Sequence, residues 1–313
     1  MSALVVFLLI IVLVALLSAI GKWQLARSRR NFPPAGKFVE IEDIKLHYVE
    51  RGTGVPIVMI HGSDGILQDF TQTIFDAVAR EFHAVAFDRP GHGYSQRPAS
   101  EPVTLAMAAR LIHLASLKLT LDRPVIVGHS YGGAVALQYA LDYPNDLSAL
   151  LLLAPGAYAD GMPNLDPGRK AMKFLGPLMA HPVFVPLARA MGRSIIDRSY
   201  RPNPTLKSYA DILREFSSRP EQFRTLADEV VHFRSGLESI IDRYGEITTP
   251  TVVIAGDVDP VTLLDRTGRR LAAVIPNAQL TILPGTGHMV HHLRPEAVLS
   301  ALRTLGTNAN PPT

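Results

Sequence analysis

The chain has 313 residues, of which 47% are hydrophobic and 19% charged, a length and balance that allow a large buried core. It contains no cysteine, which excludes disulfides, thiol catalysis and zinc–thiolate sites. The formal net charge is +3, and the positive residues are scattered along the chain, so a nucleic-acid partner is not expected.

The first segment of the chain is apolar. Residues 3–20 carry no charged side chain, and as a helix this stretch would rise about 27 Å, close to the thickness of a bilayer core. Lys22, Trp23 and several arginines follow at once, as at a membrane–water interface. We therefore expect residues 1–21 to be a transmembrane anchor and residues 22–36 a basic juxtamembrane linker.

A cleaved signal peptide is the alternative for this segment. Such a peptide requires positive charge before its apolar run and a cleavage site of small residues. Only the α-amino group of Met1 precedes the run, and the Leu-Ser-Ala sequence at residues 17–19 is a poor site. Positive charge after the run favours a cytoplasmic location for the rest of the chain. We expect a single-pass membrane protein with the domain that follows the linker in the cytoplasm.

The rest of the chain alternates short apolar runs with helix-like segments. Strands are predicted at residues 37–41, 44–50, 56–60, 83–87, from 125 to the turn at Ser130, and at 147–153, 251–255 and 279–283. Helices are predicted at residues 67–80, 103–119, 131–143 and 295–305. This alternation with short links predicts an α/β fold with a mostly parallel central sheet flanked by helices.

The alternation is interrupted once. Residues 157–248 contain no convincing apolar strand and many prolines, and they are too long for a simple connection, so we expect a helical lid there. The α/β core then has two parts, residues 37–156 and 249–307, followed by a disordered tail at 308–313. The phenylalanines expected to line an apolar pocket under the lid are Phe174, Phe184, Phe216 and Phe223.

A serine between two glycines marks the most informative turn. The sequence Gly-His-Ser-Tyr-Gly at residues 128–132 lies between an apolar run and a long run of helix formers. Glycines on both sides permit a strained strand-to-helix turn that exposes the hydroxyl of Ser130 at a helix N-terminus. We predict that Ser130 is a nucleophile; the alternative is a glycine-rich turn in another kind of α/β protein.

A serine nucleophile requires a base, and the base is usually oriented by a carboxylate. In an open parallel sheet, functional groups gather beyond the carboxyl ends of the strands. Asp257 and Asp259 follow the strand at 251–255, and His288 follows the strand at 279–283. Serine, acid and histidine thus appear in that order along the chain.

Four motifs together resemble those of α/β-hydrolase fold proteins, in the serine-nucleophile branch with a helical lid. They are His-Gly at residues 61–62, Asp-Arg-Pro-Gly-His-Gly-Tyr-Ser at 88–95, the serine turn, and Gly-His at 287–288. The resemblance covers residues 38–305. It implies that Ser130 is the nucleophile and His288 the general base. It also implies that Asp259 is the orienting acid, with Asp257 as the alternative.

The resemblance further implies an oxyanion hole made by the backbone N–H groups of Ser63 and Tyr131. It implies neither a cofactor nor a metal ion. His291 and His292 lie close to His288 in sequence, but no carboxylate at ligand spacing supports a metal site there. We interpret the other histidines near these motifs, His61, His92 and His129, as structural residues.

A serine at the nucleophile position excludes the related enzymes that open epoxides or displace halide with a carboxylate. We expect a carboxylesterase- or lipase-like hydrolase that cleaves an ester-like bond of a mostly apolar small molecule through an acyl-enzyme. The alternatives are a carbon–carbon bond hydrolase of the meta-cleavage type and a non-catalytic, membrane-tethered ligand-binding protein. The expected partners are the acyl substrate and the membrane, through the N-terminal helix.

Overall fold

The computed structural model describes residues 3–99, 101–165, 175, 178 and 181–309; Phe174 and the end of the expected tail lie outside these ranges. Its sheet follows the order β1-β2-β4-β3-β5-β6-β7-β8, with β1–β2 and β2–β4 antiparallel and the other pairs parallel. The strands are β1 (Lys37–Ile41), β2 (Ile44–Arg51), β3 (Pro56–Ile60), β4 (His83–Phe87), β5 (Val125–His129), β6 (Ala149–Leu153), β7 (Thr251–Gly256) and β8 (Ala278–Leu283). The predicted α/β fold class is confirmed.

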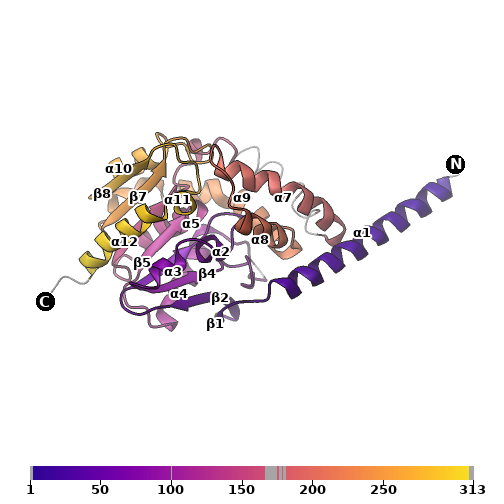
Figure 1. Cartoon of the computed structure of the whole chain (residues 1–313), viewed down its shortest axis with the longest axis horizontal. Coiled ribbons are helices and arrows are strands. Elements are labelled where there is room, and N and C mark those ends of the chain that lie inside the picture. Colours follow the sequence, from indigo (N-terminus) through magenta and orange to yellow (C-terminus); the bar gives the residue numbers. More distant parts are fainter. Residues whose placement is uncertain (1–2, 100, 166–174, 176–177, 179–180, 310–313) are drawn as a thin grey trace.

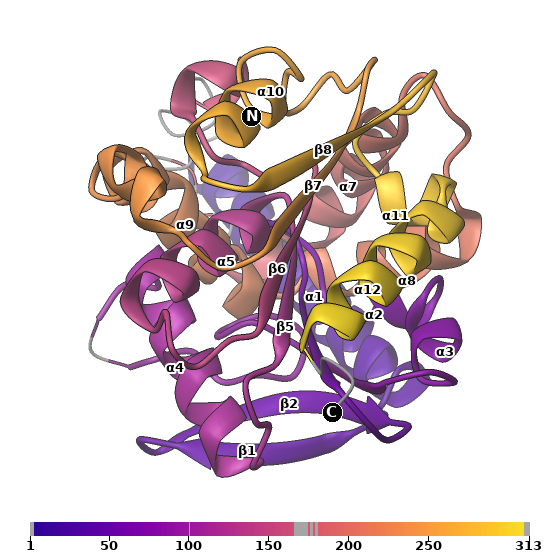
Figure 2. The same ribbon diagram turned by 90° about the vertical axis from the view of Figure 1, so that its left-hand side faces the viewer.

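Alternate residues of the inner strands enter two different cores. Val58 and Ile60 of β3 pack on one face, whereas Ile57 and Met59 pack on the other. Because both faces are covered, these strands are continuously apolar rather than alternating. The first face carries α4 (Leu105–Lys118), α5 (Tyr131–Asp142) and α10 (Gly268–Val274); the second carries α2 (Gln68–Thr71), α3 (Phe75–Val78), α11 (Val290–Leu293) and α12 (Pro295–Ala309) (Figure 2).

The single helix predicted at residues 67–80 is instead two short helices, α2 and α3. Between them, the hydroxyl of Thr73 donates to the carbonyls of Asp69 (3.0 Å) and Phe70 (3.3 Å). Side-chain bonds of this kind compete with the helical backbone and bend or interrupt it. The apolar spacing was nevertheless informative, because Phe70 and Val78 are fully buried.

The described part of residues 157–248 consists of helices and their connections, and the helices between residues 185 and 217 lie between the sheet and the N-terminal helix (Figure 1). No strand occurs among these described residues. The elements are η1 (Ala159–Gly161), η2 (Pro182–Phe184), α7 (Val185–Tyr200), α8 (Lys207–Ser217), α9 (Pro220–Glu238) and η3 (Ile241–Glu246). We refer to α7, α8 and α9 with their connections as the lid.

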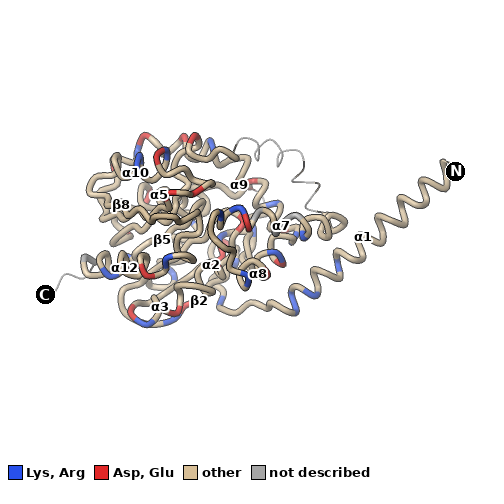
Figure 3. Tube along the Cα trace, turned by 45° about the horizontal axis from the view of Figure 1, so that its top comes forward, with Lys and Arg blue, Asp and Glu red and all other residues tan. Residues whose placement is uncertain are grey.

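Helix α1 (Ala3–Asn31) projects from the body of the protein, and its charged residues lie only in the half next to the body (Figures 1 and 3). Its length and composition fit a membrane span, and a signal sequence would fit equally. The inner half of the helix packs on η2 and on the lid. A Cβ at Gly21 would lie 2.0 Å from the carbonyl oxygen of Pro182, and Ser28 is buried. The expected linker is thus helical as far as Asn31.

Candidate active site

Ser130 lies in a strained turn between β5 and α5. Its backbone angles are φ 54° and ψ −115°, a conformation that side-chain-bearing residues rarely adopt. The turn is held by hydrogen bonds from the Ser130 amide to the Leu153 carbonyl (3.0 Å) and from the amides of Gly133 and Gly156 to the Ser130 carbonyl (both 2.9 Å). Strain that is maintained in this way commonly marks a functional position.

The two glycines of the serine motif are required by close packing. A Cβ at Gly128 would lie 2.3 Å from the carbonyl oxygen of Gly132. A Cβ at Gly132 would lie 2.2 Å from the carbonyl oxygen of Ile60, on the neighbouring strand. Both contacts are with backbone that cannot move aside, so the fold permits only glycine at these positions.

The structure brings His288 and Asp259 together. The Nδ1 atom of His288 lies 2.8 Å from Oδ2 of Asp259, and both side chains are buried. Asp257, the alternative acid, is exposed. His288 follows a strand end as expected, and its side chain is only 5% exposed.

The surroundings of Asp259 stabilise its ionised form. Its Oδ1 accepts from the amides of Val261 (2.7 Å) and Thr262 (3.1 Å), and its Oδ2 also accepts from the Thr262 hydroxyl (2.7 Å). Burial alone raises the pKa of Asp259, but His288 and these hydrogen bonds outweigh burial and leave the pKa below its usual value. A carboxylate accepts only, so Nδ1 of His288 is the donor and Nε2 is left free to accept a proton.

Ser130 and His288 line a common cavity of about 240 Å³. Ser63 lines it as well, on the turn that follows β3. The lid residues that line the cavity are Ile196, Arg198, Ser199, Tyr200, Tyr209 and Leu213. The phenylalanines expected in this role are not among the described liners. Phe216 is buried in the apolar cluster that also contains the lining residues Ile196, Tyr200, Tyr209 and Leu213, and Phe174 lies outside the described residues.

The turn at residues 61–63 packs directly against the serine. A Cβ at Gly62 would lie 3.3 Å from Cβ of Ser130. Tyr131 follows Ser130 as the first residue of α5, so its amide belongs to the start of the helix. The two residues whose N–H groups are expected to form an oxyanion hole, Ser63 and Tyr131, therefore come from two elements that meet at Ser130.

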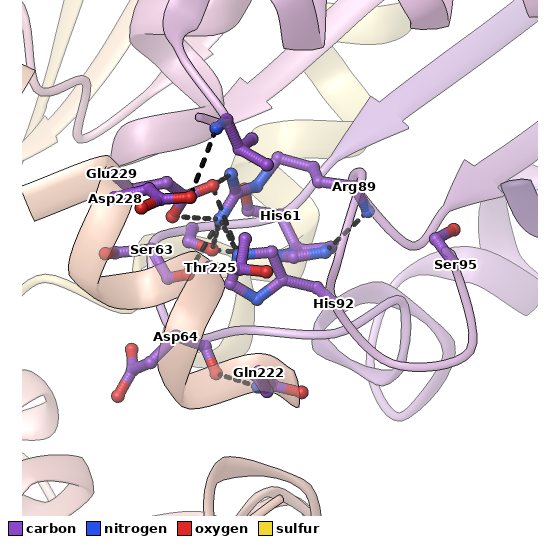
Figure 4. A network of polar contacts seen from close by, with 12 residues as sticks. His61, Ser63, Asp64, Arg89, His92, Ser95, Gln222, Thr225, Asp228 and Glu229 are labelled. Carbon is purple, nitrogen blue, oxygen red and sulfur yellow. Dashed lines mark hydrogen bonds and ion pairs between the residues drawn. The ribbon is translucent and has the colours of Figure 1, made fainter. Parts of the chain in front are cut away.

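Arg89 belongs to the motif at residues 88–95 but was not among the predicted site residues. It follows β4 and is fully buried. Its guanidinium is joined to Glu229 on α9 of the lid by two contacts, one of them 3.2 Å long (Figure 4). Burial alone raises the pKa of Glu229, but Arg89 and then His92 outweigh burial and leave it lowered, so this is a buried ion pair.

Asp69, which also lines the cavity, is hydrogen-bonded to three histidines. Its carboxylate lies 3.0 Å from His129 Nδ1, 3.0 Å from His291 Nε2 and 2.9 Å from His292 Nε2. Asp69 and the last two are close enough to hold a metal ion, so a carboxylate does accompany these histidines, contrary to the expectation from sequence. The separations are those of ordinary hydrogen bonds. Burial raises the pKa of Asp69, but the histidines hold it well below its usual value.

Comparison with known proteins decides the family. The model of the alpha/beta hydrolase family matches residues 57–301, most of the chain. The chain belongs to the alpha/beta hydrolase family. A further match is an uncharacterized protein of Mycobacterium tuberculosis, 30% identical over 271 residues that cover 83% of this chain and 77% of the relative.

Two other similar proteins have named activities. The 2-hydroxy-6-oxo-6-phenylhexa-2,4-dienoate hydrolase of Burkholderia cepacia is 28% identical over 261 residues, covering 80% of this chain and 89% of the relative. A solved structure of an N-acyl homoserine lactone degrading enzyme is 27% identical, with a TM-score of 0.64, covering 86% of this chain and 99% of the other. The resemblance inferred from the four sequence motifs is therefore confirmed at the level of the family.

Proposed function

We propose that this α/β hydrolase is a serine hydrolase that cleaves an ester-like bond of a mostly apolar small molecule through an acyl-enzyme. The observation that carries the proposal is the strained turn of Ser130 in one cavity with His288, which is itself bonded to Asp259. Nucleophile, base and orienting acid are the three groups that acyl transfer to serine requires.

In the proposed reaction, Nε2 of His288 takes the proton of Ser130 as Oγ attacks the substrate carbonyl carbon. The negative charge that forms on the carbonyl oxygen is stabilised by the amides of Ser63 and Tyr131. His288 then gives its proton to the leaving group, and the bond to that group breaks. Water, deprotonated by His288, then attacks the carbonyl carbon of the acyl-enzyme. The bond to Ser130 Oγ breaks, His288 returns the proton to Oγ, and the acid is released.

We further propose that residues 1–21 anchor the protein in a membrane and that the catalytic domain is cytoplasmic. The apolar outer half of α1 and the basic residues at its inner half support this proposal. A signal sequence, the competing interpretation, would be removed. Mass determination of the N-terminus in the membrane fraction distinguishes the two.

Labelling with a fluorophosphonate probe tests the proposed chemistry. The wild-type protein should be labelled, and Ser130→Ala should abolish labelling without changing the melting temperature. Ser199→Ala, which changes another serine lining the cavity, is the matched control and should be labelled normally. A folded wild-type protein that resists labelling would favour the non-catalytic ligand-binding alternative.

Carbon–carbon bond hydrolysis is the second candidate, favoured by the named relative from Burkholderia cepacia. Substrates of that class, as the name states, are dienoates and carry a carboxylate. Arg198 of the lid lines the cavity and supplies a cation suited to such a group. Assays of the wild type with aryl esters, acyl lactones and a dienoate separate the two candidates by which substrate is turned over. If the dienoate is the substrate, Arg198→Ala should raise KM for it and leave KM for the uncharged esters unchanged.

A further inference from the structure

The buried ion pair between Arg89 and Glu229 joins the lid to the turn that carries Ser63 (Figure 4). Both side chains are completely inaccessible to solvent. Withdrawing one partner of such a pair leaves an uncompensated charge in the interior, which is strongly unfavourable. The charge of Arg89 is therefore compensated only while α9 keeps Glu229 beside it.

The guanidinium of Arg89 also donates hydrogen bonds to the backbone of the turn at residues 61–63. Its Nε donates to the carbonyl of His61 (3.0 Å), and its Nη2 donates to the carbonyls of Gly62 (2.8 Å) and Ser63 (2.7 Å). One side chain thus binds three consecutive carbonyl groups. Hydrogen bonds from a charged donor to buried carbonyls are among the stronger ones in proteins.

The carbonyl of Gly62 and the amide of Ser63 belong to the same peptide group. In a planar trans peptide the C=O and N–H bonds point in opposite directions, so holding the carbonyl fixes the direction of the amide. The Gly62 oxygen also lies 2.8 Å from Nδ1 of His61 and accepts from the amide of Gly65 (3.2 Å). This peptide cannot rotate without breaking all of these contacts.

The tautomer of His61 follows from its contacts. The amide of Arg89 donates to Nε2 of His61 (3.0 Å), so Nδ1 carries the proton and donates to Gly62. Burial, with Arg89 and then His92 beside it, lowers the pKa of His61 well below its usual value, which keeps the ring neutral. His61 therefore acts as a second support of the same carbonyl.

We propose that Arg89, its charge balanced by Glu229 of the lid, is a positioning residue that holds the Ser63 N–H toward the oxyanion. The guanidinium also lies 4.5 Å from the ring centroid of Tyr131, whose amide is the other expected donor. Because Glu229 is on α9, the position of this helix relative to the core determines the position of the Arg89 guanidinium, and through it the direction of the Ser63 N–H group. The inference rests on the proposed serine-hydrolase function.

Two conservative variants test the inference in the full-length protein. In Arg89→Lys the single ammonium cannot reach the carbonyls and Glu229 together, and kcat should fall on the order of 100-fold. In Glu229→Gln the shape is kept but the charge is lost, and kcat should fall on the order of 10-fold. KM should change little in both, because the oxyanion forms only in the transition state.

A readout specific to the oxyanion is the affinity for a trifluoromethyl ketone, which binds serine hydrolases as a hemiketal anion. Its affinity should fall in parallel with kcat/KM in both variants. The matched control is Asp228→Asn. Asp228 precedes Glu229 on α9 and forms an ion pair with Arg97, which lies in the loop after β4 that also carries Arg89. Among the described residues, Asp228 makes no contact with the turn at residues 61–63. That variant should keep the kcat and ketone affinity of the wild type.

Equal losses in Glu229→Gln and Asp228→Asn would show general seating of the lid and overturn the inference. Unchanged kcat and ketone affinity in both Arg89→Lys and Glu229→Gln would overturn it too, while leaving the hydrolase proposal intact. A wild type without labelling or turnover would remove the hydrolase proposal and the inference together. Melting curves accompany each variant, and if Arg89→Lys does not fold, the isosteric Glu229→Gln decides.

Discussion

The hydrogen bond between Asp259 and His288 determines which nitrogen of the histidine carries the proton. Because the lowered pKa keeps Asp259 ionised, its carboxylate only accepts, and Nδ1 of His288 must carry the proton. The amides and hydroxyl around Asp259 hold this carboxylate in one orientation. Its proposed role is therefore to select a tautomer as well as to balance charge.

Asp259→Asn should reduce kcat for an ester on the order of 10³-fold or more, with the fold retained. The introduced amide can donate to Nδ1, which favours the tautomer that leaves no acceptor toward Ser130. Steady-state kinetics and a melting curve measure the two effects. The exposed neighbour Asp257 provides the control, since Asp257→Asn should behave as the wild type. A larger loss at Asp257 would reverse the assignment.

At the scale of single elements, α1 has two halves with different surroundings. The outer half is exposed, whereas the inner half is part of the body. Arg219, nearly buried, donates to the hydroxyl of Ser28 (3.3 Å), and Arg29 pairs with Glu221 (3.3 Å). Arg219 also lies 3.8 Å from the ring centroid of Phe216. Removing the inner half would uncover this arginine and part of the lid.

Two truncations distinguish the halves. Deletion of residues 1–20 should give a soluble protein with the melting temperature and the esterase activity of the full-length protein. Deletion of residues 1–31 should lower the melting temperature, by about 2–4 °C for each kcal/mol of lost packing. Differential scanning calorimetry and membrane fractionation measure the results. Equal melting temperatures of the two truncated proteins would show that the inner half adds no stability. If the protein that lacks residues 1–20 remains in the membrane fraction, the proposed anchor is wrong.

At the scale of the whole molecule, several buried histidines are neutral in the folded state. Burial lowers the pKa of His291 to about 3 and also lowers those of His61, His92 and His129. In the unfolded chain a histidine titrates near pH 6.5. The unfolded state therefore binds more protons below that pH, so the folded state is fully stabilised above about pH 6.5 and loses stability as the pH falls.

The free energy of unfolding should accordingly decrease between pH 7.5 and pH 5, and His291 alone should contribute about 1.4 kcal/mol per pH unit below pH 6.5. Urea denaturation at the two pH values measures this. His291→Asn should show a smaller decrease than the wild type, whereas His232→Asn, at a partly exposed position of α9, should not. A stability independent of pH in this range would contradict the neutral histidines.

Local signals made part of this arrangement predictable. Ser130 is marked by its flanking glycines, and Asp259 and His288 follow strand ends, where the topology of a parallel sheet gathers functional groups. Arg89 and Glu229 are 140 residues apart, and Asp69 and His291 are 222 apart. No periodicity or motif records which distant charges become partners. The composition of the lid likewise indicated its helical class but not which face of each helix meets the cavity.

The continuity of α1 has a mechanical consequence. A helix of 29 residues is about 43 Å long, more than the roughly 30 Å of a hydrocarbon core, and the excess is the part fastened to the lid. With the outer half in a bilayer, no hinge separates the span from the body. A change in the tilt of the helix would therefore rotate the whole domain, and the height of the cavity above the lipid would change with the tilt.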